Sequence, residues 1–149
     1  PHGDEVAGKA WRSNTATRVH NDALRYARLT WLALDEQGAL AQDSLVDWLV
    51  HVADSMYAQH LQTLINWEVE ALEQIVVALM PNSAKAERTA WLKAFLSVVQ
   101  AESSLTKKQM TALQAAVDAG AAQVADHRKL AGQHIGGKRA KKLLARFKH

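Results

Sequence analysis

Apolar residues recur with helical spacing through residues 44–80, a stretch that contains no Gly, Pro, Lys or Arg. Side chains three or four residues apart lie on one face of an α-helix. At about 1.5 Å per residue, a continuous helix here would be roughly 55 Å long. The pattern therefore predicts one long central helix. Its apolar positions are Leu45, Leu49, Val52, Ala53, Met56, Tyr57, Leu61, Leu64, Ile65, Leu72, Ile75, Val76 and Leu79.

The ends of this central helix have local signals. Ser44 and Asp47 resemble a capping box, in which each side chain accepts a hydrogen bond from a free backbone amide. Pro81 lacks an amide hydrogen and disfavours helical backbone at the residue before it, so the helix should end there. The apolar pattern thins over residues 58–63, which is where a kink would fall if the helix were interrupted.

Three further helices are predicted around the central one. The first follows an N-cap at Asn14 or Thr15 and runs to about Leu34, before a loop containing Gly38. Another begins at the capping residues Asn82 and Ser83 and continues to about residue 101.

The last of the main helices carries the clearest start signal. Thr106 and Gln109 have capping-box spacing, and the apolar pattern then continues towards Gly132. We therefore expect an all-α fold, an antiparallel bundle of four main helices around one long central helix, plus a short basic C-terminal helix. The expected organisation is an N-terminal arm over 1–13 with a short helix near 5–11, a helical bundle domain over 14–133, and a glycine-hinged basic C-terminal segment over 134–149.

Charge is unevenly distributed along the chain, although the net charge is only +3. Residues 1–28 hold five basic and three acidic residues, 29–84 hold none and eight, and 85–149 hold thirteen and four. The central helix is thus an acidic block between basic flanks. Pairing between these blocks in the folded protein is one interpretation; a basic surface left free for a polyanion is the other.

Residues 138–148 have the most unusual composition in the chain, with six basic residues and no acidic one. Ala140, Leu143, Leu144 and Phe147 have helical spacing, which is typical of a basic amphipathic helix. Such a segment can neutralise phosphates without reading sequence. The alternatives are an apolar face docked on the bundle and a disordered end. The candidate nucleic-acid-binding residues are Lys138, Arg139, Lys141, Lys142, Arg146 and Lys148, extended by Lys107, Lys108, Arg128 and Lys129.

Several polar residues of the central helix are candidates for a buried site. His60 and Glu68 fall on its apolar stripe, where a carboxylate needs a partner such as Arg25 or Arg28. We interpret them as a polar network in the core, because the Glu-x-x-His spacing of di-iron bundles is absent.

A second polar group follows one face of the same helix. Asp47, His51 and Asp54 are spaced four and three residues apart. They form at most an open, weak metal site, and we interpret them as a solvated face. We therefore predict no catalytic residue, no resident metal and no cofactor.

Trp67 lies off the main apolar stripe and is the candidate partner-binding residue, because an exposed indole often anchors an interface. The alternative is that the bundle surrounds the central helix on more than one side and buries this residue.

The function classes are narrowed mainly by what the sequence lacks. There are no cysteines, no phosphate-binding loop and no nucleophile elbow. No apolar run has the roughly twenty residues needed to cross a bilayer, so we expect a cytoplasmic protein without stable membrane insertion. The leading hypothesis is a non-enzymatic accessory subunit of a larger assembly that binds nucleic-acid backbone. The alternative is a helical adaptor that binds proteins through its acidic central helix.

Overall fold

The computed structural model describes residues 5–6, 9–34 and 39–133, and side chains over 10–34 and 41–124. The helices of this part confirm the all-α class: α1 Ser13–Leu34, α2 Ala39–His60, α3 Val69–Leu79, α4 Lys85–Glu102 and α5 Lys107–Gln133, with a 3-10 turn η1 at Asn82–Ala84. The predicted short helix near 5–11 is wrong, because β1 (Glu5–Val6) pairs antiparallel with β2 (Lys9–Ala10).

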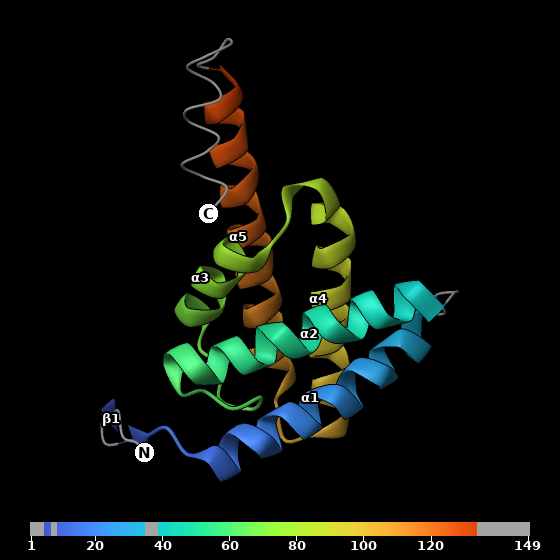
Figure 1. Cartoon of the computed structure of the whole chain (residues 1–149), viewed down its shortest axis with the longest axis vertical. Coiled ribbons are helices and arrows are strands. Elements are labelled where there is room, and N and C mark those ends of the chain that lie inside the picture. Colours follow the sequence, from blue (N-terminus) through green and yellow to red (C-terminus); the bar gives the residue numbers. More distant parts are fainter. Residues whose placement is uncertain (1–4, 7–8, 35–38, 134–149) are drawn as a thin grey trace.

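The helices form two antiparallel hairpins that cross each other. Helices α1 and α2 make one hairpin, and α4 and α5 make the other, which runs across it (Figure 1). Helix α3 packs along α5 and also touches α2, while α1 and α2 both contact α4. The expected arrangement around one long central helix is therefore wrong.

The segment predicted as a single helix is divided into α2 and α3 by residues 61–68. Leu61 has a φ of 56°, which is left-handed backbone that ends a right-handed helix. The Gln62 side chain accepts a hydrogen bond from the Glu68 amide at 2.8 Å and donates one to the Glu68 carboxylate at 2.9 Å. The first of these bonds gives an acceptor to the backbone amide of Glu68, which is the N-cap of α3. The second joins the two side chains and holds Gln62 in place.

The connection keeps helix-like apolar spacing because it is folded into the core. Leu61, Leu64 and Trp67 are 8%, 5% and 6% exposed. A buried loop and a buried helix can use the same apolar positions, so periodicity did not reveal the break. The break includes part of the stretch over 58–63 where the pattern thins.

Other predicted helix ends are largely confirmed. Helix α1 ends at Leu34, and α3 ends at Leu79, with Met80 in extended backbone before Pro81. The Gln109 amide donates to the Thr106 hydroxyl at 3.1 Å, and the Thr106 amide donates to the Gln109 side chain at 2.9 Å. That is the predicted capping box.

Three predicted helix starts do not have the expected caps. Helix α1 begins at Ser13, so Asn14 and Thr15 lie inside its first turn. Helix α2 begins at Ala39, so Ser44 lies inside the helix and the predicted start there is wrong. Asn82 and Ser83 belong to η1, and neither η1 nor α4 has a side-chain hydrogen bond at its N-cap.

The described core connects the two hairpins. Its largest fully buried side chains come from α2, α3, α4 and α5, while α1 contributes the fully buried Ala23 and Ala27. The large ones include Leu45, Leu49, Met56, Leu72, Ile75, Leu92, Phe95, Leu96 and Leu113. Arg88 of α4 places its guanidinium over the rings of Trp48 and Trp91, at 5.4 Å and 4.8 Å from their centroids. This cation–π pair helps hold α2 against α4.

Candidate functional site between α1 and α2

Most of the predicted basic surface is beyond the described residues. This applies to the six cations of residues 138–148, and to the short C-terminal helix expected there. Arg128 and Lys129 belong to α5, which continues to Gln133, but the description of side chains ends at residue 124. Lys107 and Lys108 are exposed in the first turn of α5.

Helix α5 separates the basic residues that it carries. Lys107 and Arg128 are 21 positions apart in this helix, which corresponds to roughly 30 Å along its axis. The structure therefore does not bring Lys107 and Lys108 together with Arg128 and Lys129 as one compact patch. A single ligand could contact both pairs only if it extended along the helix.

Trp67 is not an exposed partner contact, so that prediction is wrong. Its side chain is 6% exposed and stacks on Phe95, with ring centroids 6.2 Å apart and an interplanar angle of 25°. The break between α2 and α3 turns the Trp67 side chain into the core. The prediction of an exposed Trp67 assumed that one helix continued through residues 61–68, and this assumption placed the side chain on the wrong face. The alternative that the core surrounds this segment is correct.

The predicted polar network of His60 and Glu68 is also absent. His60 is the last residue of α2, whereas Glu68 follows the break and is exposed beside Gln62. The two residues therefore do not share one helix face. On α2, Asp47 and His51 are exposed, and Asp54 contacts His20. Among the residues with described side chains, no three His, Asp or Glu residues come together as a metal-binding group.

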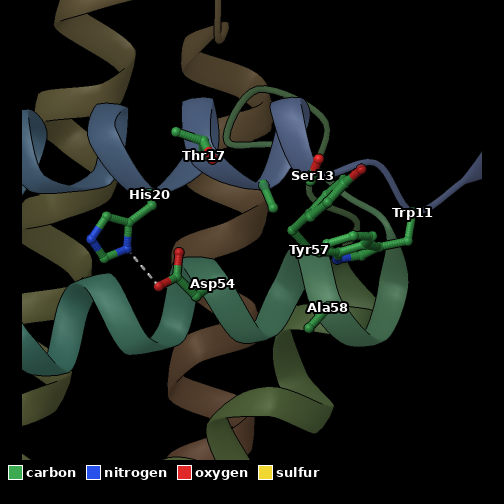
Figure 2. A pocket seen from close by; sticks show the side chains of 8 residues that line it. Trp11, Ser13, Thr17, His20, Asp54, Tyr57 and Ala58 are labelled. Carbon is green, nitrogen blue, oxygen red and sulfur yellow. Dashed lines mark hydrogen bonds and ion pairs between the residues drawn. The ribbon is translucent and has the colours of Figure 1, made fainter. Parts of the chain in front are cut away.

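The main candidate site is a groove between the first half of α1 and the last half of α2. It has a volume of 450 Å³, within the usual range of about 300–1,000 Å³ for ligand pockets. Figure 2 shows the lining side chains, which lie with His20 and Asp54 at one end and Trp11 and Tyr57 at the other. The remaining lining residues are Ser13, Ala16, Thr17 and Ala58.

The polar end is made by one residue from each helix. His20 Nδ1 lies 2.8 Å from Asp54 Oδ2, and the two side chains are 48% and 40% exposed. This contact bridges α1 and α2 across 34 positions of sequence. It uses one carboxylate oxygen, so Asp54 Oδ1 keeps the capacity to accept from a further donor.

The aromatic end is held in place by the backbone that enters α1. The Tyr57 hydroxyl accepts a hydrogen bond from the Arg12 amide at 2.9 Å, and Tyr57 is only 4% exposed. Trp11 lies beside it, with ring centroids 6.5 Å apart, and remains 37% exposed. Trp11 therefore offers an open indole surface beside a fixed phenol ring.

This arrangement suits recognition of a side chain that combines an apolar part with a donor or cation. Aromatic faces attract cations, and a carboxylate pairs well with a guanidinium or ammonium group. The groove was not predicted, because its two walls come from different helices. Only the short spacing of Ser13, Ala16, Thr17 and His20 along α1 hinted at a shared face.

No family model, curated protein or solved structure matches this chain. None of the helices in the described part of the chain is long and apolar enough to span a bilayer.

Proposed function

We propose that this protein is a non-enzymatic accessory subunit that binds nucleic-acid backbone through the cations of its C-terminal region. The proposal rests on the charge distribution, because residues 85–149 hold thirteen basic and four acidic residues. Clustered Lys and Arg residues bind phosphates and release condensed counterions, which produces affinity without base recognition.

The observation that supports this proposal best is the pattern of ion pairs. Where side chains are described, the ion pairs are His20–Asp54, Arg25–Asp22 and Lys93–Asp118. None of them joins the acidic block of residues 29–84 to a cation of residues 85–124. Within that part of the molecule, the acidic block does not neutralise the basic region that follows it.

The described lysines of α5 add to this support. Lys107 and Lys108 are exposed at one end of the helix, and the other end extends beyond α3 and α4 in Figure 1. Helix α5 therefore ends at one end of the long axis of the described part of the molecule, and the basic residues 138–148 follow it in the sequence.

The test is binding of labelled duplex DNA and of single-stranded RNA to the full chain, measured by fluorescence anisotropy across salt concentrations. Neutralising about six phosphates gives a slope of about −5 in log K against log salt on duplex DNA, and a loss on the order of 10³ between 50 and 200 mM salt.

A matched pair of triple variants separates the proposed surface from general charge. Lys138, Lys141 and Lys142 changed to Gln should reduce the salt slope by about 3. Arg18, Arg25 and Arg28 changed to Gln remove the same charge from the exposed face of α1 and should leave the slope nearly unchanged. Equal effects of the two variants, or no binding at low salt, would refute the proposal.

A second candidate function is a protein-binding adaptor, which exposed carboxylates on α2 favour. Asp43 and Asp47 are both exposed, and α2 contains no Lys or Arg that could neutralise them. This surface would bind a cationic partner. Absence of nucleic-acid binding at low salt, with retained association to a purified basic protein such as lysozyme that Asp43→Asn and Asp47→Asn weaken, would favour the adaptor.

A further inference from the structure

The groove between α1 and α2 has no Lys or Arg among its described lining residues, and α2 contains none along its length. Its polar end presents Asp54 together with His20, and its aromatic end presents Trp11 beside Tyr57. A complementary occupant therefore needs basic groups next to apolar side chains.

The chain contains a segment with this chemistry. Residues 138–148 combine six basic residues with Leu143, Leu144 and Phe147, and they follow α5 beyond the described residues. We propose that the groove binds residues 138–148 of a second copy of this chain. In this complex a Lys or Arg pairs with Asp54, and an apolar side chain of the segment packs on Trp11.

A second copy is the better source of this segment than the same chain. In Figure 1, α5 ends at one end of the long axis of the molecule, and α1 begins at the opposite end. Helix α5 has 27 residues, or roughly 40 Å of length. When fully extended, the ten residues from Gln133 to Leu143 reach at most about 35 Å and the fourteen to Phe147 at most about 50 Å, so only the last few residues of the same chain could enter the groove. The segment of another molecule has no such limit on its reach.

The consequence is an interface between two different surfaces of identical chains. Such a head-to-tail contact produces closed rings or open chains of copies. The contact uses the cations that would otherwise bind phosphates, so self-association and binding of a polyanion would compete. Self-association through this contact does not require nucleic acid.

Photocrosslinking in the full chain tests the proposal directly. A benzoylphenylalanine placed at Ala58, an exposed lining residue, reports what occupies the groove. Equal amounts of ¹⁴N- and ¹⁵N-labelled protein are mixed and irradiated. They are then cleaved after acidic residues, because Asp126 is the last acid and the C-terminal segment stays in one fragment. The expected product joins position 58 of one label to fragment 127–149 of the other.

Paired variants show whether the groove itself is responsible. Asp54→Asn should lower the crosslink yield about two- to fivefold, the range for a partly exposed charge pair. Asp47→Asn removes an equal charge from the same helix outside the groove and should leave the yield unchanged. Trp11→Ala should lower it further, with folding checked by circular dichroism.

Each remaining outcome overturns the proposal. These outcomes are crosslinks within one copy only, crosslinks to a segment other than 127–149, no crosslink at all, or equal losses in Asp54→Asn and Asp47→Asn. A failure of the self-association proposal can be distinguished from a failure of the nucleic-acid proposal, because nucleic-acid binding is measured separately by fluorescence anisotropy.

Discussion

Gly120 of α5 lies directly against Val76 of α3. A Cβ atom added at Gly120 would stand 2.7 Å from Val76 Cγ1, 2.8 Å from Val76 Cβ and 3.0 Å from the backbone oxygen of Glu73. Real Cβ atoms do not approach other carbons so closely, so the two helix backbones pack at a distance that only glycine permits.

Gly120→Ala should therefore destabilise the protein, although alanine is the better helix former by about 1 kcal/mol. Overpacking costs about 1–3 kcal/mol, so we expect a net loss of up to about 2 kcal/mol in the free energy of unfolding measured in urea. Adding Val76→Ala removes the obstructing methyl groups and should recover part of the loss in a double-mutant cycle. A Gly120→Ala variant more stable than wild type would show that the helices separate easily.

Trp67 should behave as a core residue. Trp67→Ala is expected to lower the free energy of unfolding by about 3–5 kcal/mol, because it removes a large buried ring and leaves a cavity beside Phe95. Trp11→Ala is the matched control, because Trp11 is 37% exposed, and should cost about 1 kcal/mol. Similar small losses from both substitutions in chemical unfolding would contradict the buried placement of Trp67.

The capping box at the start of α5 should contribute measurably to stability. Thr106→Ala removes the acceptor of the Gln109 amide, and is expected to cost about 1 kcal/mol. Thr106→Ser keeps the hydroxyl and should retain most of that stability. Ser83→Ala is the control, since Ser83 is exposed and makes no cap hydrogen bond, and it should change the unfolding free energy by less than about 0.5 kcal/mol.

Gln62 should be required for the break between α2 and α3. Gln62→Ala leaves the Glu68 amide without its side-chain acceptor, and the expected cost is about 1–3 kcal/mol. Hydrogen exchange at the Glu68 amide should become faster in this variant. Asn66→Ala, at an exposed turn position, should leave that exchange rate unchanged. An unaltered Glu68 exchange rate in Gln62→Ala would mean that other contacts hold the connection.

The candidate site was only partly accessible from the sequence. The cations of residues 138–148 can be recognised from the sequence, and their role in binding nucleic acid stays a proposal. The groove was not predictable, because Asp54 and His20 meet across 34 positions and Arg12 and Tyr57 across 45. No local pattern records which faces of two helices will turn towards each other.

Local chemistry determined where several helices end. The end of α1 at Leu34, the end of α3 before Pro81 and the start of α5 after Thr106 all depend on groups within a few residues of each other. The periodic apolar pattern also determined the all-α class. These features could be derived without coordinates, because helical hydrogen bonds and caps join near neighbours in the chain.

Tertiary packing alone decided that residues 61–68 interrupt a helix and that Trp67 turns inward onto Phe95. The apolar residues of this segment can be buried as a helix or as a folded connection, and local propensity does not separate the two. Contacts with α4, distant in sequence, favour the connection because they bury Trp67 in the core. For the same reason, the crossing of the two hairpins and the groove between α1 and α2 within one hairpin are properties of the folded chain alone.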